Sequence, residues 1–203
     1  MSTRTDVSQE VIKPKSKKSA KDDEAFFALL KEASRGDRAA LNSLCEQIVK
    51  GVLFRATHLL GNPTDAEDLT QEVLIRVCER ISDLRDFRAF RAWLAKIISN
   101  EANRYYAKYP KSGAPLNIED YVDQLYEERA YFFPSESAES AEARKAVMDA
   151  IATLSFRQRE AVMLHYFDGL SMTEIAKVMG VSKQSVSEYL ALSRNKLRKE
   201  LDK

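Results

Sequence analysis

Apolar residues recur every three or four positions along most of this 203-residue chain, which is the spacing of an amphipathic α-helix. The clearest stripe lies between two breaks, Gly36-Asp37 and Gly61-Asn62-Pro63, and consists of Leu41, Leu44, Ile48, Val52, Ala56 and Leu59. Glycine and proline end helices at such positions. The pattern predicts an all-α protein made of two small helical domains.

The first predicted domain spans residues 22–110 and holds four helices. One helix is expected over 22–33, and a second between the two breaks. Thr64-Asp65-Ala66-Glu67 has the form of a capping box and predicts the start of a third helix, which runs to Ile81. After a loop over 82–87, a fourth helix ends near Tyr109-Pro110. Four helices of this length form one compact domain.

The second predicted domain spans residues 142–203. Ser155 and Ser171 each stand three residues before a Gln or a Glu, which predicts two further capping boxes. A short helix over 172–179, the turn Gly180-Val181-Ser182 and a longer last helix form a helix-turn-helix pattern, in which glycine supplies the positive φ of the turn. An acidic linker over 111–141 separates the two domains.

The net charge of +1 conceals separate charged blocks. Residues 85–111 hold seven basic and two acidic residues, whereas 117–143 hold eight acidic residues and one arginine. Such segregation suggests different surfaces for different partners. Residues 1–21 are expected to be a disordered basic tail with no secretory signal, and no apolar run is long enough for a membrane span. Cys45 and Cys78 are interpreted as reduced core residues of a cytoplasmic protein.

The helix-turn-helix pattern predicts binding to duplex DNA. In such units the N-terminal turn of the second helix enters the major groove, which presents Lys183, Gln184 and Ser187 to base edges beside the capping Ser182. Arg194 and Lys196 are expected near phosphates. Glu188, Tyr189 and Leu192 make this helix less basic than is usual, so the duplex contact is expected to be weak, unusual in sequence or supported by another protein.

A second candidate surface follows the fourth helix of the first domain. Basic residues and aromatic rings alternate before and along it, which suits single-stranded DNA because bases stack on rings while cations hold the backbone. Phe90 and Trp93 fit a core position better than a stacking role. The candidates for this surface are Arg85, Asp86, Phe87, Arg88, Lys96, Asn100, Asn103 and Arg104.

Three runs resemble the extracytoplasmic-function (ECF) group of bacterial sigma factors: Asp65 to Val73, Phe90 to Asn100, and Leu154 to Glu160 with Phe167 to Ser171 and Glu174-Ile175-Ala176. The resemblance implies a protein that joins core RNA polymerase and reads duplex −35 and melted −10 promoter DNA. It assigns polymerase binding to Asp65, Asp68, Gln71 and Glu72. It further implies that the loop over 82–87 holds a flipped −10 base, and that an anti-sigma factor is a partner.

Two alternatives differ in class. A helix-turn-helix regulator that does not join polymerase would explain the second domain, but it leaves the acidic helix and the stripe around Asn100 unexplained. An enzyme would need a nucleophile–base set, a phosphate loop or a metal site, and none of these patterns is visible. We therefore expect no catalysis, no cofactor, no metal, no small-molecule substrate and no membrane insertion. The expected location is the cytoplasm, on the nucleoid when bound to polymerase.

Overall fold

The computed structural model describes residues 17–109 and 138–202, and within these ranges the regular structure is entirely helical. The prediction of an all-α protein is confirmed. Two helical groups follow each other in the chain, here called the N-terminal bundle (residues 17–109) and the C-terminal bundle (residues 138–202). Most of the predicted basic tail and most of the predicted linker lie outside the described residues.

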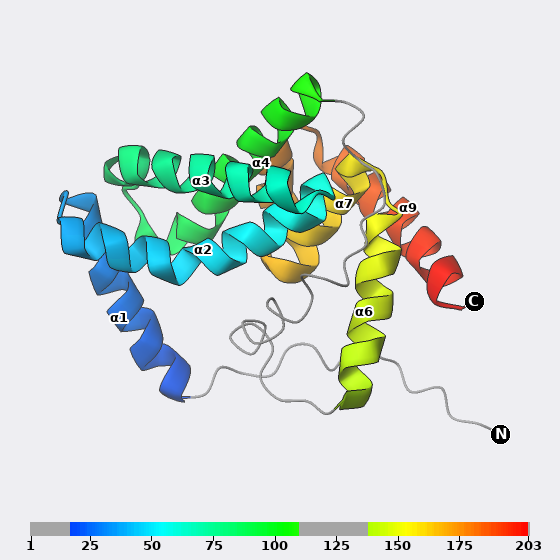
Figure 1. The fold of residues 1–203 in the computed structure, drawn as a ribbon, viewed down its shortest axis with the longest axis horizontal. Coiled ribbons are helices and arrows are strands. Elements are labelled where there is room, and N and C mark those ends of the chain that lie inside the picture. Colours follow the sequence, from blue (N-terminus) through cyan, green and yellow to red (C-terminus); the bar gives the residue numbers. More distant parts are fainter. Residues whose placement is uncertain (1–16, 110–137, 203) are drawn as a thin grey trace.

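Four helices form the N-terminal bundle (Figure 1). They are α1 (Lys17–Ser34), α2 (Arg38–Leu60), α3 (Pro63–Arg80) and α4 (Phe90–Lys108), with two 3-10 turns, η1 (Ile81–Asp83) and η2 (Phe87–Ala89), before α4. The predicted stripe of α2 is largely buried: Leu44, Val52 and Ala56 are no more than 1% exposed. They pack with apolar residues of α3 and α4, among them Val73 and Ile98, in one core. The first helix is longer than the predicted span of 22–33.

The chemistry of the helix ends follows the sequence, with one correction. Asp37 accepts a hydrogen bond from the amide of Ala40 at 2.8 Å and so caps α2. Gly61 ends α2 in the left-handed region, at φ 75°. The predicted capping box at Thr64 is wrong, because Asn62 is the cap and its Oδ1 accepts from the amide of Thr64 at 3.0 Å. A proline at the first helical position has no backbone amide that needs a hydrogen-bond partner. Pro63 therefore favours a helix that starts at residue 63, before Thr64.

The C-terminal bundle consists of α6 (Ala138–Ala152), α7 (Phe156–Val162) with its π-helical extension η3 (Met163–Phe167), α8 (Met172–Met179) and α9 (Lys183–Leu201). Helix α6 begins inside the segment predicted as linker. Both capping boxes are present: Gln158 accepts from the amide of Ser155 at 3.1 Å, and Glu174 accepts from the amide of Ser171 at 2.8 Å. Helices α8 and α9 form the predicted helix-turn-helix.

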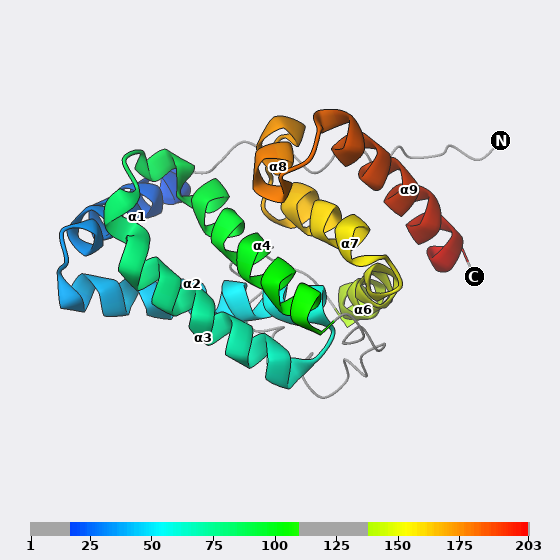
Figure 2. The same ribbon diagram turned by 90° about the horizontal axis from the view of Figure 1, so that it is seen from above.

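The two bundles pack against each other along α4. Seen from above, α4 lies between α3 on one side and α7 and α8 on the other, and α2 passes beneath α3 and α4 (Figure 2). Their cores interlock: Ala95 of α4, 1% exposed, belongs to the apolar cluster of the C-terminal bundle, and Phe156 of α7, 8% exposed, belongs to that of the N-terminal bundle. The ring of Phe156 stacks on Tyr106 with centroids 4.5 Å apart. The described chain is therefore in a closed arrangement.

The two cysteines correct a prediction about the core. Cys45 on α2 is half-buried and Cys78 on α3 is exposed, so neither is a core residue. Their sulfur atoms lie 3.6 Å apart as free thiols. Burial and the neighbouring Cys78 raise the pKa of Cys45 to about 11. Thiols from two adjacent helices thus meet at the surface of the N-terminal bundle.

Candidate nucleic-acid interface

The start of α9 presents an exposed polar surface. Gly180 turns the chain at φ 67°, and Ser182 caps α9 by accepting from the amide of Ser185 at 3.0 Å. Buried Val186 and Leu190 hold the opposite side of α9 against the bundle. The predicted base-reading residues Lys183, Gln184 and Ser187 are all exposed on the free side.

Further contacts of α9 affect how freely its side chains can reach DNA. Gln184 donates to the carboxylate of Glu188 at 3.1 Å, so two exposed residues of this surface are already joined. Lys196 donates to the carbonyl of Thr153, which ties α9 to the end of α6. Arg194 is exposed. Of the two residues predicted at phosphates, Lys196 has an internal partner in this structure.

The acidic residues of α3 face away from the two cores. Asp68, Gln71 and Glu72 are exposed, while the same helix buries Leu69 and Val73. Asp65 is half-buried and lies beside the hydroxyl of Tyr105 on α4. Burial and the hydrogen bond with the Asp65 carboxylate raise the pKa of Tyr105 to about 12. Helix α3 thus offers a negatively charged surface anchored at one end by a tyrosine.

The segment before α4 is a folded corner rather than an open loop. Asp86 caps the turn η2 by accepting from the amide of Arg88 at 2.9 Å. Arg85 and Arg88 are exposed, whereas Phe87 packs partly against the core. Two of the four predicted residues here are therefore free cationic side chains at the surface.

Helix α4 has three sides with different surroundings. Phe90 is 4% exposed and Trp93 packs against the same core, so both rings are structural, as the sequence suggested. Asn100 and Arg104 are exposed, and Arg104 pairs with Glu101 at 2.8 Å. Both side chains are accessible, and their place on a single-strand surface stays a prediction.

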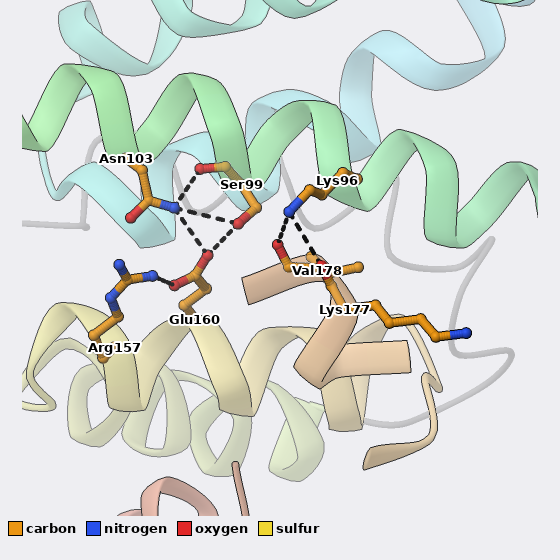
Figure 3. Close-up of polar contacts among 7 residues, drawn as sticks. All are labelled: Lys96, Ser99, Asn103, Arg157, Glu160, Lys177 and Val178. Carbon is orange, nitrogen blue, oxygen red and sulfur yellow. Dashed lines mark hydrogen bonds and ion pairs between the residues drawn. The ribbon is translucent and has the colours of Figure 1, made fainter. Parts of the chain in front are cut away.

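Lys96 and Asn103 share a face of α4 with Asn100 at helical spacing, but they lie on the part of it that contacts the C-terminal bundle, whereas Asn100 is exposed. The ammonium of Lys96 donates to the carbonyls of Lys177 and Val178, at 3.1 and 2.6 Å, at the end of α8 (Figure 3). The amide of Asn103 donates to the carbonyl of Ser99 at 2.7 Å and lies 3.4 Å from the carboxylate of Glu160 on α7. The single outward face predicted for α4 is therefore divided, because part of it is covered by the C-terminal bundle.

Two carboxylates at this contact were missed from the sequence. Glu160 is 1% exposed, accepts from the hydroxyl of Ser99, and pairs with Arg157 at 3.0 Å. Asp168 forms a largely buried ion pair with Arg55 of α2. Desolvation by burial raises the pKa of Asp168, and the adjacent Arg55 opposes that shift. A carboxylate in an acidic or mixed segment reads as a solvated residue, so the sequence held no signal for these roles.

The comparisons with known proteins agree with this architecture. A family model described as sigma-70 region 2 matches residues 44–110, and one described as sigma-70, region 4 matches residues 144–197. The ferric citrate uptake sigma factor FecI of Escherichia coli K12 is 30% identical over 66% of this chain and 75% of its own length. The chain belongs to the ECF group of sigma factors.

Two further relatives describe the extent of the similarity. The ECF sigma factor BldN of Streptomyces coelicolor is 28% identical over 81% of this chain, which spans 61% of that relative. Among solved structures, the sigma factor RpoE of Bartonella quintana in complex with the anti-sigma factor NepR has a TM-score of 0.57 at 21% identity, covering 79% of this chain and 96% of that one. This structural likeness supports the fold alone. Below, the N-terminal and C-terminal bundles are called region 2 and region 4.

Residues 17–109 and 138–202 contain no group of three or more His, Cys, Asp and Glu side chains placed to hold a metal ion. None of the helices in the same ranges is long and apolar enough to cross a membrane.

Proposed function

We propose that this sigma factor binds core RNA polymerase and directs it to promoters by reading duplex −35 and melted −10 DNA. The observation that carries the proposal is the presence, in one chain, of a region 2 with an exposed acidic helix and a region 4 with an exposed helix-turn-helix. A regulator that acts without polymerase needs only the second. We place the working boundaries of the two domains at residues 22–110 and 142–203, joined by the linker over 111–141.

The acidic side of α3 is the proposed polymerase contact. Asp68, Gln71 and Glu72 are exposed together and project from a helix whose other side is buried in region 2. Asp65, held by Tyr105, marks the end of the same surface. A rigid helix that presents carboxylates suits a basic partner surface, and like charges keep the same helix away from DNA phosphates.

The −10 element is the proposed ligand of the corner before α4 and of one side of α4. The exposed Arg85 and Arg88 would hold the backbone of a displaced strand, with Asp86 and Phe87 at the turn between them. Asn100 and Arg104 would continue this contact along α4, as would Lys96 and Asn103 once they are released from region 4. Captured bases would offset a melting cost of about 1–2 kcal/mol per base-pair step.

The −35 element is the proposed ligand of α9. Lys183, Gln184 and Ser187 would face base edges from the first turns of the helix, where Ser182 fixes the start. Arg194 and Lys196 would contact phosphates, which set position without reading sequence. Because Glu188 stands among these residues and joins Gln184, we expect a modest affinity for duplex DNA.

Sigma factors contribute binding energy and do not themselves catalyse the reaction, and we infer the same for this chain. We place it in the cytoplasm, and on the nucleoid when it is bound to polymerase, because its proposed partners are there. The relative RpoE is seen with an anti-sigma factor, and we infer that this chain has such a partner as well. No small-molecule substrate or cofactor enters this function.

Run-off transcription tests the proposal. Purified bacterial core polymerase is given a library of promoter fragments, with and without this protein. Transcripts that start at a defined set of sites only in its presence are expected, and aligning those sites gives the −35 and −10 elements. Asn100→Ala should reduce open-complex formation and leave core binding intact. If the protein binds duplex DNA but neither binds core polymerase nor starts transcripts, the regulator without polymerase is correct instead.

A further inference from the structure

The two thiols of region 2 lie where its second and third helices pack together. Cys45 of α2 and Cys78 of α3 are free cysteines, and their sulfur atoms are 3.6 Å apart. The sulfur atoms of a disulfide are about 2.05 Å apart, so these two need to approach each other by about 1.5 Å. Rotation about the side-chain bonds produces movements of this size. The pair is therefore close enough to react.

The core holds the backbones that carry the two thiols. Leu44, which precedes Cys45, and Val77, which precedes Cys78, are both 0% exposed and belong to the same apolar cluster. Close packing of this kind leaves little freedom for either helix to slide or turn. The two thiols are thus preorganised for each other, which favours their mutual reaction over the reaction of either one with a dissolved thiol.

The two thiols differ in their access to solvent. Cys78 is exposed, whereas Cys45 is half-buried. Burial, and then the hydrogen bond with Cys78, raise the pKa of Cys45 to about 11. Because the thiolate is the nucleophile in thiol chemistry, Cys45 is a poor first nucleophile at neutral pH. A dissolved oxidant should therefore react first with Cys78.

Cys78 also lies on the side of α3 that carries the proposed polymerase contact. Gln71, Ile75 and Cys78 follow one another at intervals of four and three residues, which places them on one helix face, and all three are exposed. Seven residues span about 10 Å along an α-helix. One side of a standard protein interface covers about 800 Å², or a patch roughly 30 Å across. A partner centred on Gln71 would therefore reach Cys78.

An adduct on Cys78 would obstruct this contact. A mixed disulfide with a peptide-sized thiol places a bulky group on the exposed face of α3. The core of an interface is packed as densely as a protein interior, and an inserted group of that size forces the two surfaces apart. A thiol alone at this position would thus let one oxidant molecule disable the polymerase contact, unless a second thiol removes the adduct.

We propose that Cys45 and Cys78 form a reversible oxidation site, in which Cys78 reacts with a low-molecular-weight disulfide and Cys45 displaces the adduct, so that the polymerase contact of α3 stays free. The part that concerns polymerase rests on the proposed function of α3. Disulfides in reducing compartments are usually transient. Reduction of the bond between Cys45 and Cys78 returns both thiols.

The chemistry consists of two thiol–disulfide exchanges. Cys78 gives its proton to solvent and its thiolate attacks one sulfur of the oxidant, whose sulfur–sulfur bond breaks and releases a thiolate that is then protonated. Cys45 next gives its proton to solvent and attacks the sulfur of Cys78, which breaks the mixed disulfide and releases the second thiolate, protonated in the same way. Two protein thiols are oxidised to one disulfide, and the oxidant is reduced to two thiols.

Mass spectrometry of the full-length protein tests this chemistry, with oxidised glutathione as the probe. Wild-type protein should lose two hydrogen atoms and keep no adduct. Cys45→Ser should keep one glutathione adduct on Cys78, because no second thiol can displace it. Cys78→Ser should form an adduct several-fold more slowly than Cys45→Ser, since only the half-buried thiol is left. Equal rates in the two variants would contradict the assignment of Cys78 as the first thiol to react.

Binding to core polymerase tests the consequence. Reduced wild-type protein, oxidised wild-type protein and reduced Cys45→Ser should bind equally tightly. The adduct of Cys45→Ser should bind about tenfold more weakly, and a dithiol reductant should restore its affinity. The matched control is Ala28→Cys in protein that also carries Cys45→Ser and Cys78→Ser, because it places the same adduct at an exposed position of α1. Its adduct should leave binding unchanged.

The outcomes separate the oxidation site from the proposed function. A stable adduct on wild-type protein would show that Cys45 does not displace it, and the site would be overturned. Unchanged core binding by the adduct of Cys45→Ser, or an equal loss for the adduct of Ala28→Cys, would overturn the protection of α3. If reduced wild-type protein does not bind core polymerase, the proposed function of α3 fails and the protection with it, whereas the masses still report whether the two thiols join.

Discussion

Arg159 joins the ends of two helices from different regions, and its removal should uncouple them. Its guanidinium donates to the carbonyls of His58 and Leu59 at the end of α2, at 3.0 and 3.3 Å. It also donates to the carbonyl of Ala152, the last residue of α6, at 3.1 Å and to that of Leu154 in the turn after α6 at 3.0 Å. One planar cation thus satisfies carbonyls that no helical amide can reach.

The loss of stability expected on removing Arg159 follows from opposing contributions. Hydrogen bonds from a charged donor contribute roughly 1.5–3 kcal/mol each, but burying the guanidinium costs part of that gain, and water can reach some carbonyls once the side chain is gone. Desolvation by burial lowers the pKa of Arg159, and this desolvation opposes part of the gain from the hydrogen bonds. We therefore expect Arg159→Ala to lower the free energy of unfolding by about 2–4 kcal/mol, roughly a 10 °C fall in Tm for a chain of this size.

Denaturation in urea, followed by circular dichroism at helical wavelengths, measures this effect. Wild-type protein should unfold in one merged transition, and Arg159→Ala should shift and split it, because the two regions no longer support each other. Arg159→Lys keeps the charge but lacks the planar guanidinium. Its ammonium should hydrogen-bond to one helix end only, so the free energy of unfolding should fall by about half as much as in Arg159→Ala. A stability for Arg159→Ala within about 0.5 kcal/mol of wild type would refute the coupling, since that is the range of ordinary surface substitutions.

Three smaller predictions concern caps and thiols. Asn62→Ala should destabilise region 2 by about 1 kcal/mol in a thermal melt, and Asn62→Asp, which can still accept from the same amides, should restore most of it. Hydrogen bonds from Ser171 lower the pKa of Glu174, so the stability from this cap is present above the usual carboxyl pKa and is lost as pH falls through the lowered value. Glu174→Gln keeps the capping box, so this loss of stability at low pH should be absent from a pH titration of the variant. An unchanged loss would show that another carboxylate causes it. Oxidation by a small-molecule disulfide should join Cys45 to Cys78, with loss of two hydrogen atoms by mass spectrometry and a gain of about 3–4 kcal/mol if the bond forms without strain, whereas mixed adducts on each thiol would contradict the pairing.

The helix ends were largely predictable because their chemistry is local. Ser171 and Ser182 cap the helices that their sequence positions predicted, and Gly180 takes the left-handed turn between them. The cap of α3 was misplaced by two residues, since Asn62 before a proline competes with Thr64 and the proline decides the start. Local rules thus locate a helix end well when one candidate stands alone.

The surface of α4 was predicted less well because it depends on contacts between distant segments. Lys96 and Asn103 are polar, and helical spacing alone cannot tell whether a polar stripe faces solvent, DNA or another domain. The small residues Ala92, Ala95 and Ser99 beside them were the available signal for close helix packing. Nothing in the sequence marked Glu160 as their partner. Glutamate side chains are seldom buried, so the sequence alone predicts an exposed residue, whereas Glu160 is 1% exposed in the structure.

Photocrosslinking from position 103 tests the account most directly, since it asks which partner the shared side of α4 meets in each state. A photoreactive amino acid replaces Asn103 in the full chain, and the products are mapped in the free protein and in an open complex with core polymerase and promoter DNA. We expect crosslinks to α7 near Glu160 in the free protein and to the displaced −10 strand in the open complex. Crosslinks that remain on α7 in a transcribing complex, or that never reach DNA, would contradict the claim that region 4 and the −10 element occupy this surface in turn.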